Sequence, residues 1–366
     1  MPQVSLVIPT YREAENLKAL CEAIEVILLE SKISYEIIIA DDHSPDGTIE
    51  IVESLTRRYP IRLIQPLQRQ RDLSLAVLDG IGNAKSEFVV VMDADLSHPV
   101  DKIPELLSML SEGIFVLGSR YIEGASFEKG WGIWRLLNSS IATVLAWPLI
   151  QCKDPMSGFF GLCKADLPSA ESLTPIGYKI ALELMVKGNF DTVIEIPIHF
   201  KDRAMGRSKL NLKQQINYLR HLRRLYLFKF RLQTEFIQYG LVGASGFVVD
   251  ICFYFAMQVL SVDHLLARAI SFWPAVSWNW ALNRWFTFRE RSRRPRAKQW
   301  LEFVITSFIG FSINWGVYSW STTNIDFFAD NRLAALIMGI LFASVFNFIS
   351  ATFFIYSNVR DSKKLF

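Results

Sequence analysis

The second half of the sequence is far more apolar than the first, and this difference limits how the chain can fold. Four apolar segments, near residues 236–260, 265–288, 300–322 and 333–357, each approach the ~20 residues that cross a ~30 Å hydrocarbon core. Residues 1 to about 235 instead mix charged and apolar residues, as water-soluble α/β domains do. The sequence therefore predicts a water-soluble N-terminal part followed by a bundle of four transmembrane helices.

Basic residues around these segments predict how they are oriented. The connection at 289–298, RERSRRPRAK, is strongly basic, whereas those at 261–265 and 322–332 are nearly free of Lys and Arg. The chain opens on a strand pattern, VSLVIPTY at 4–11, without the basic start of a signal peptide. By the positive-inside rule, we expect an integral membrane protein whose N-terminal domain, basic loop and both termini face the cytoplasm.

The segment at 212–235 joins the two parts and is rich in Arg, Tyr and Phe. This composition suits two amphipathic helices lying at the membrane interface, and an ordinary surface helix with a linker is the alternative. The net charge of only +3 argues against a nucleic-acid partner and leaves the lipid bilayer as the expected one. We predict three parts: 1–211, a catalytic domain; 212–235, interfacial helices and linker; and 236–366, a membrane domain.

Polar residues inside the apolar segments are costly there and invite a functional interpretation. Asp250 is interpreted as a packing partner of Asn279, Asn314 or Asn347, and Arg284 as an anchor that snorkels to the membrane surface.

Two of the apolar segments resemble each other. SWNWALNRWFTF at 277–288 aligns with VFNFISATFFIY at 345–356, which suggests a parallel internal repeat. Coincidence among aromatic-rich helices is the alternative.

In the first half, three apolar runs read as buried parallel strands. They lie at 4–9, 35–40 and 87–92, and helical patterns at 15–30 and 46–58 separate them. Alternating strands and helices predict an α/β fold with a doubly wound, mainly parallel, Rossmann-like sheet, which binds ligands at the carboxyl ends of its strands.

The third of these strands runs into two carboxylates, in FVVVMDADLSHP at 88–99. No glycine-rich dinucleotide or P-loop motif is present, so phosphates need a different holder. Asp93 and Asp95 at a strand end suit a hard divalent cation that is completed by water and substrate phosphates. A solvated turn or a helix cap is the alternative.

These motifs occur in an order that resembles family 2 glycosyltransferases of the dolichol-phosphate mannose synthase type. The motifs that carry the resemblance are PTYRE (9–13), DDHSPDGT (41–48), DADLSHP (93–99), GSRY (118–121), WGIWRLLNSS (131–140), DPMSGFF (154–160) and HFKDRAMGRSKL (199–210). FIQYGLVGASGFVVD (236–250) and NWALNRWFTF (279–288) resemble a GtrA-type membrane domain.

The resemblance implies a GT-A type catalytic fold and a nucleoside subsite. Pro9, Tyr11, Glu13, Ala40 and Asp42 are expected to hold the nucleoside. Physically, a tyrosine ring offers a base an aromatic surface, and carboxylates accept hydrogen bonds from base or ribose.

It also implies that Asp93, Ala94 and Asp95 bind the sugar nucleotide. Asp93 and Asp95 would engage Mg²⁺ or Mn²⁺. Ser97 stands where some relatives have a glutamine ligand, so it would act as a third ligand directly or through a water.

Cationic residues complete the implied site. Arg120, Arg203 and Lys209 resemble the residues that contact the nucleotide phosphates, and Arg120, Arg135 and Ser139 match the site for the lipid phosphate. Catalysis is expected to rest on the two aspartates together with Arg120 and Arg203. RDLSLAV at 71–77 departs from the glycine-rich turn of many relatives.

The activity that the resemblance implies is an inverting, metal-dependent transfer of mannose from GDP-mannose to dolichyl or undecaprenyl phosphate, giving a β-linked lipid sugar. Another nucleotide sugar, UDP-glucose above all, is the alternative donor. A lipid-sugar flippase with a degenerate enzyme domain is the alternative of a different class.

Overall fold

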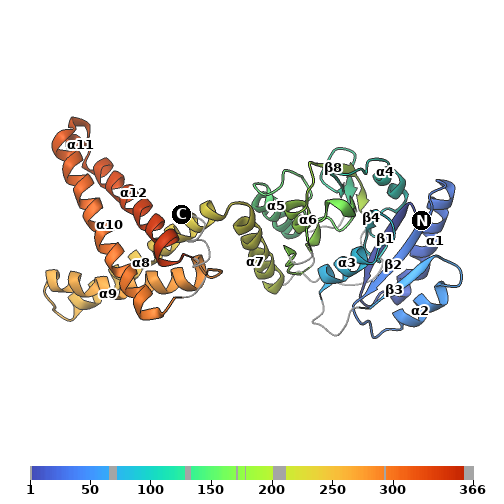
Figure 1. Ribbon diagram of the computed structural model, residues 1–366, viewed down its shortest axis with the longest axis horizontal. Helices are drawn as coiled ribbons and strands as arrows, with labels where there is room; N and C mark the ends of the chain where they lie inside the picture. Colours follow the sequence, from blue (N-terminus) through green and yellow to red (C-terminus); the bar gives the residue numbers. More distant parts are fainter. Residues whose placement is uncertain are drawn as a thin grey trace, which may run out of the picture. The chain divides into compact units, whose positions relative to one another are not determined.

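The computed structural model describes residues 2–65, 72–127, 133–169, 172–177, 179–200, 212–291 and 294–357. The chain divides into two compact units, Met1–Lys229 and Phe230–Phe366 (Figure 1). The boundary falls between helix α7 (Leu212–Lys229) and helix α8 (Arg231–Val259).

The N-terminal unit is built around a seven-stranded sheet with the order β3-β2-β1-β4-β7-β5-β8. The sheet is parallel except for β7, which runs antiparallel to both β4 and β5. The strands are β1 (Val4–Thr10), β2 (Tyr35–Asp41), β3 (Ile61–Ile64), β4 (Phe88–Val91), β5 (Ile114–Ser119), β7 (Phe160–Cys163) and β8 (Thr192–Pro197). A separate short pair is formed by β6 (Ser126–Phe127) and β9 (His199–Phe200).

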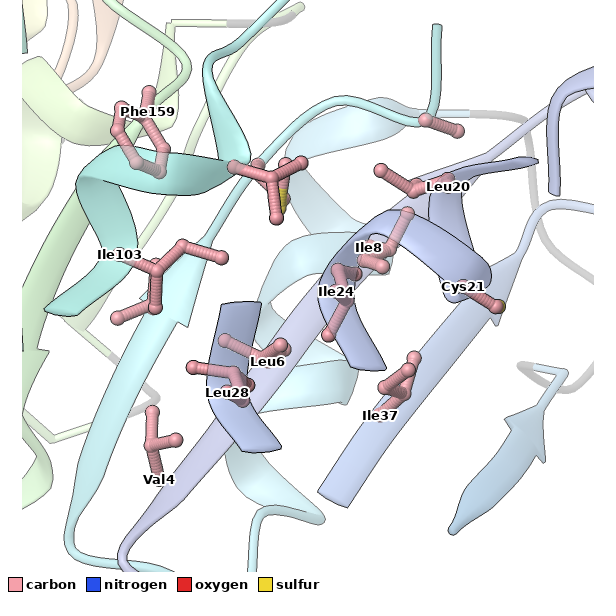
Figure 2. Close-up of a cluster of buried hydrophobic side chains, with 14 of the residues drawn as sticks. Val4, Leu6, Ile8, Leu20, Cys21, Ile24, Leu28, Ile37, Ile103 and Phe159 are labelled. Atoms are coloured by element: carbon pink, nitrogen blue, oxygen red, sulfur yellow. The ribbon is translucent and has the colours of Figure 1, made fainter. Parts of the chain in front are cut away.

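Helices cover both faces of this sheet. They are α1 (Ala14–Glu30), α2 (Thr48–Leu55) and α4 (Ile103–Ser108) on one face and α3 (Leu73–Gly82) and α6 (Ile180–Lys187) on the other. Helix α5 (Ile133–Ala146) is joined to α7 by two hydrogen bonds. Figure 2 shows Leu20, Ile24 and Leu28 of α1 packed over Leu6 and Ile8 of β1. Since successive side chains of a strand point to opposite faces, Val7 joins the second core, which contains residues of α3 and α6. Cores on both faces explain why the strands are almost wholly apolar.

The predicted doubly wound sheet is confirmed, and its three predicted strands correspond to β1, β2 and β4. Because β1 lies between β2 and β4, the carboxyl ends of the three strands meet at one edge of the sheet. The antiparallel β7 was not predicted.

Helix α7 occupies most of the segment for which two interfacial helices were expected. The structure has one continuous helix over Leu212–Lys229, and residues 231–235 are the first turns of α8. The segment 212–229 contains no Gly or Pro, so nothing in it breaks the helix.

The C-terminal unit consists of helices. They are α8, α9 (His264–Leu282), α10 (Arg296–Asn324), the short α11 (Asp326–Asp330) and α12 (Arg332–Ser350), and π-helical turns at Asn283–Thr287 and Ala351–Ile355 follow α9 and α12. Among the described residues, three helices are long and apolar enough to cross a membrane: Arg231–Val259, Arg296–Asn324 and Arg332–Ile355. The second predicted span is therefore a helix, α9, but not one of these three.

Two helical hairpins within this unit share several features, as the predicted repeat requires. The amide of Asn279 packs where a Cβ on Gly246 would lie, and Asn347 packs on Gly310 in the same way. A π-helical turn follows each asparagine at the same spacing. Phe288 and Tyr356, which end the two turns, stack with ring centroids 4.5 Å apart.

Two interpretations of polar residues in this unit are wrong. Asp250 pairs with Arg268 and accepts a hydrogen bond from Ser271, rather than contacting an asparagine. Arg284 is buried and donates to the side chain of Gln299 and the carbonyl of Arg294, so it does not snorkel. In both cases the partner lies on another segment, which local sequence does not reveal.

Candidate active site

The carboxyl ends of β1 and β2 form a rigid corner of the site. Thr10 donates to the buried carboxylate of Asp41 over 3.2 Å, and Ser44 donates to it through its hydroxyl and its backbone N–H. The Ser44 hydroxyl in turn accepts from the backbone N–H of Arg12. Asp41 is therefore a structural residue that holds the two loops together, a role that sequence analysis did not assign.

Asp42, the next residue, differs from Asp41 in an informative way. It is buried, and its Oδ1 accepts no hydrogen bond from any residue that the structure describes. A buried carboxylate oxygen without a donor is costly unless a ligand supplies one. This geometry suits the predicted contact of Asp42 with a nucleoside.

The other predicted nucleoside residues lie at the same corner. Pro9 and Ala40 are partners in the pairing of β1 with β2 and are buried. Tyr11 follows β1 and is partly buried, with the guanidinium of Arg12 over its ring. Glu13 precedes α1, but its carboxylate accepts from Asn16 instead of capping the helix. The five residues are thus brought together at two adjacent strand ends.

The acidic pair lies just beyond β4. The side chain of Asp93 is 34% exposed, whereas Asp95 is buried. Asp95 accepts from both the backbone N–H and the hydroxyl of Ser97, the latter over 2.6 Å. Ala94 between them is buried. Ser97 therefore orients Asp95, and the three oxygen-bearing side chains lie in one turn.

His98 and Gly158 shape the space around Asp93. The Nδ1 of His98 accepts from the Asp93 backbone N–H, and its ring stacks on Phe159. Burial lowers the pKa of His98, which favours the neutral ring. A Cβ at position 158 would lie 3.3 Å from an Asp93 carboxylate oxygen, so glycine keeps that space open.

Arg120 directly follows β5 and forms a bidentate pair with Asp154. Its Nε and terminal nitrogen lie 2.7 and 2.8 Å from the two carboxylate oxygens, and its backbone N–H donates to the same group. Burial alone would lower the pKa of Arg120, but the hydrogen bonds and charge of Asp154 outweigh it and raise that pKa. Sequence analysis quoted the DPMSGFF motif but gave Asp154 no role.

The predicted lipid-phosphate residues are only partly described. Ser139 lies on α5, and its hydroxyl hydrogen-bonds the hydroxyl of Tyr121 at 2.8 Å. Tyr121 is the residue that follows Arg120 in the sequence. Arg135 lies on the same helix, but its side chain is outside what the structure describes. Arg203 and Lys209 are also outside the described residues.

The unusual RDLSLAV segment forms the start of α3. Asp72 is the N-cap residue, and its Oδ1 accepts from the backbone N–H of Ser74. Burial, with a smaller contribution from the negative charge of Asp42, raises the pKa of Asp72. The Oδ2 of Asp72 accepts a hydrogen bond from the backbone N–H of Gly177, so this segment is also tied to the chain that precedes α6.

The mainly parallel sheet, with an acidic pair just after β4, defines the class of the protein. Residues 5–165 match the glycosyl transferase family 2 model, and residues 238–356 match the GtrA/DPMS transmembrane domain model. The protein is a glycosyltransferase with a membrane domain.

Similarity to known proteins identifies the family within this class. The chain is 36% identical over 321 residues to a dolichol-phosphate mannosyltransferase of Pyrococcus furiosus, covering 86% of this chain and 90% of that one. It is 39% identical to the dolichol-phosphate mannosyltransferase of Saccharomyces cerevisiae, over 69% of this chain and 93% of that one. Among solved structures, glucosyl-3-phosphoglycerate synthase from Mycobacterium tuberculosis is 17% identical, covers 62% of this chain and 79% of its own, and has a TM-score of 0.46. On the identity to the first two relatives, the chain belongs to the dolichol-phosphate mannosyltransferase family.

Proposed function

We propose that the chain transfers mannose from GDP-mannose to the phosphate of a polyprenol, dolichyl or undecaprenyl phosphate, with inversion at the anomeric carbon. The observation that carries this proposal is that Asp42, the Asp93–Asp95 pair and Arg120 follow the carboxyl ends of β2, β4 and β5, at one edge of the sheet. The names of its relatives, dolichol-phosphate mannosyltransferases, support the transferred sugar and the lipid acceptor, and GDP as the nucleotide of the donor is part of the proposal.

The nucleoside binds at the corner formed by the ends of β1 and β2. The unpaired oxygen of Asp42 accepts a hydrogen bond from a ribose hydroxyl or a base N–H, and Tyr11 offers its ring to the base. Asp41, already held by Thr10 and Ser44, keeps this corner rigid before substrate arrives.

A divalent cation, Mg²⁺ or Mn²⁺, fits beside Asp93 and Asp95. The donors are carboxylate and hydroxyl oxygens, and Gly158 leaves space next to Asp93. Within the described part of the chain, no three His, Cys, Asp or Glu side chains gather to hold a metal alone, so substrate phosphate and water would complete the shell. When bound, the cation neutralises charge on the leaving diphosphate.

The chain's own residues then position the two substrates. Ser97 holds Asp95 in place, and Asp154 fixes the orientation of the Arg120 guanidinium. Near neutral pH a phosphate monoester is already an anion, so no general base is needed. An oxygen of the lipid phosphate forms a bond to the anomeric carbon while the bond from that carbon to the diphosphate oxygen breaks, and GDP leaves with the electron pair.

An apolar face of the N-terminal unit supports docking onto the membrane. On α5 the exposed residues Leu137, Ile141 and Val144 recur at helical spacing, and Ile216 and Leu219 are exposed on α7. Two tyrosines of α7 donate to carbonyls of α5, so the helices are joined into one surface. Such a surface, with the basic residues of α7, suits anionic lipid headgroups and brings the site to the acceptor phosphate.

In the membrane, we propose that α9 crosses together with the three longer helices, giving four spans. The basic residues between α9 and α10 then lie on the cytoplasmic side with the catalytic unit and both termini.

A donor and acceptor screen tests this function. The purified chain is supplied with Mn²⁺, polyprenyl phosphate and either GDP-mannose or UDP-glucose, and the lipid product is identified by mass spectrometry. We expect lipid-linked mannose from GDP-mannose, and GDP should raise the melting temperature more than UDP does, because the tighter ligand stabilises the folded state more. Glucose transfer from UDP-glucose alone would replace the donor assignment, and no transfer from either would refute the proposal.

A further inference from the structure

The loop between α5 and β7, residues 147–159, borders the candidate site. Asp154 of this loop accepts hydrogen bonds from Arg120, and Gly158 leaves the space beside Asp93 open. The loop consists of turns and extended chain without a helix or strand. Since loops are more mobile than the elements that they connect, the place of Asp154 depends on the contacts that hold its backbone.

Glu195 of β8 ties this loop to the sheet. Its Oε2 accepts from the backbone N–H of Lys153 over 2.8 Å, and its Oε1 accepts from the backbone N–H of Asp154 over 3.1 Å. Hydrogen bonds to an ionised acceptor are stronger than those between neutral groups. One carboxylate thus binds two successive peptide groups, which fixes both the position and the direction of the chain at Asp154.

The place of Glu195 within β8 is unusual for a glutamate. It is half-buried and pairs in register with Leu117 of β5, whose side chain lies in the second core. Paired residues of neighbouring strands point to the same face of a sheet, so this carboxylate leaves a face that is otherwise apolar. Glutamate is depleted in strands, and departures from local preference are typical of functional positions.

The contacts continue from the loop to Arg120. The Asp154 side chain is only 1% exposed, and it accepts from Nε, from a terminal nitrogen and from the backbone N–H of Arg120 over 2.7, 2.8 and 3.0 Å. Strands β5 and β8 are paired along their length, so the strand that leads to Arg120 and the strand that carries Glu195 form one frame. The carboxylate of the frame holds the loop, and the carboxylate of the loop holds the guanidinium.

We propose that Glu195 is a positioning residue for the transfer reaction. It holds the backbone of Asp154, and Asp154 in turn keeps the guanidinium of Arg120 directed at a substrate phosphate. This inference rests on the proposed function, in which Arg120 contacts a phosphate. Because a misplacement of about 1 Å can lower a rate about a hundredfold, a tie of this kind acts on the rate of transfer as well as on stability.

Glu195→Gln tests the proposal by steady-state kinetics of mannose transfer. The variant keeps the shape of the side chain, but its amide has only one acceptor oxygen for the two peptide N–H groups. We expect kcat to fall about fivefold, as for one lost hydrogen bond. A folded Glu195→Gln protein whose kcat stays within about twofold of wild type would overturn the proposal.

Glu36→Gln is the matched control. Glu36 is also a strand glutamate that accepts from a backbone N–H, that of Lys85, but it lies near the amino end of β2, away from the site. The control should lower the melting temperature and leave kcat unchanged. It therefore shows that a loss of stability alone does not slow transfer by the folded protein.

A double-mutant cycle separates positioning from a purely structural role. If Glu195 acts through Asp154, the variant Asp154→Asn has already released Arg120. Adding Glu195→Gln to that variant should then lower kcat less than about twofold, because coupled residues have non-additive effects. A full additional fall of kcat in the double variant would contradict the proposal.

Hydrogen exchange of the unmodified full-length protein provides a test that needs no variant. GDP with Mn²⁺ and polyprenyl phosphate should together slow exchange of the amides of Lys153 and Asp154, because a bound phosphate restrains Arg120 and hence the loop. The amide of Lys85, held by Glu36, is the control and should not change. Exchange at residues 153 and 154 that the ligands leave unchanged would refute the role of Glu195.

These measurements separate this inference from the proposed function. If the wild type transfers mannose and Glu195→Gln transfers it equally well, the proposed function stands and the role of Glu195 is refuted. If the wild type transfers no mannose, the proposed function fails and this inference fails with it.

Discussion

Neighbouring aspartates in this site do different work, and their hydrogen bonds tell them apart. Asp41 is surrounded by donors from Thr10, Ser44 and Gln65, whereas Asp42 keeps one buried oxygen without a donor. The same contrast separates Asp95, which Ser97 orients, from the more exposed Asp93. A structural carboxylate is one whose partners are all present before substrate binds.

This contrast predicts the effect of replacing Asp42. Asp42→Asn keeps the shape but removes the charge that accepts from the nucleoside, so the KM for the nucleotide sugar should rise about tenfold. The KM for polyprenyl phosphate should not change. Steady-state kinetics with each substrate varied in turn checks this, and an unchanged donor KM would place the nucleoside elsewhere.

Asp154 offers a second test at the scale of single residues. Asp154→Asn leaves the Arg120 guanidinium without its bidentate partner in a largely buried position, which should destabilise the N-terminal unit by about 3 kcal/mol. Transfer should fall as well, because Arg120 is no longer held in one orientation. Thermal unfolding and transfer are measured together. Glu25→Gln, which breaks the exposed pair with Arg58, is the control and should change neither; equal melting temperatures for Asp154→Asn and wild type would contradict this account.

At the scale of elements, α7 is joined to α6 through a buried carboxylate. Glu183 of α6 accepts from Lys187, from the backbone N–H of Thr174 and from His221 of α7. Burial alone would raise the pKa of Glu183, but these hydrogen bonds outweigh it and lower that pKa. The carboxylate therefore stabilises the folded state only while it is ionised.

The sign of this shift sets a pH dependence. The ordinary glutamate pKa is about 4.3, and the unfolded chain binds more protons than the folded one just below it. The stabilisation is thus complete above about pH 4.3 and is lost as pH falls through the lower folded pKa. Glu183→Gln should lower the melting temperature at pH 7, and its difference from wild type should shrink below pH 4. An equal difference at both pH values would contradict the argument, and the exposed Glu112→Gln is the control.

The apolar stripe on α5 gives another prediction for an element. Val144→Asp places a charge on the surface proposed to enter the membrane, so the KM for polyprenyl phosphate should rise while the KM for the nucleotide sugar stays constant. Val26→Asp puts the same charge on an exposed valine of α1 and should change neither. If both variants behaved alike in the transfer assay, α5 would not be the docking surface.

The helices and strands themselves were easier to predict from the sequence than the way in which the strands pair. The strands β1, β2 and β4 are short apolar runs because helices cover both faces of the sheet. A short apolar run can be recognised in the sequence alone. The antiparallel β7 is only four residues long, and Phe160–Cys163 carries no period that distinguishes its direction. Direction in a sheet depends on connections across the whole fold.

The candidate site shows the same limit. Asp93 and Asp95 were found because they follow an apolar strand, and Arg120 was found through the resemblance of its motif, whereas Asp154 acts on Arg120 from a segment distant in sequence. Arg284 was misinterpreted for the same reason, since its acceptor Gln299 lies on the next helix.

At the scale of the whole molecule, the chain consists of two units of different chemistry. The N-terminal unit holds the acidic pair and Arg120, and the C-terminal unit has helices that are long and apolar enough to cross a membrane. A polyprenyl phosphate has a long apolar tail and an anionic head, so an enzyme for it needs both a lipid environment and a site for phosphate chemistry. The division of the chain matches the two ends of that acceptor.

The central claim is that mannose transfer depends on the acidic pair at the end of β4. Its most direct test is the transfer of radiolabelled mannose from GDP-mannose to polyprenyl phosphate in membranes that contain either the wild-type chain or Asp95→Ala, at equal protein levels. We predict transfer by the wild type and a loss of at least about a hundredfold in the variant, since a main stabiliser of the leaving diphosphate is removed. Transfer at an undiminished rate by Asp95→Ala would contradict the account.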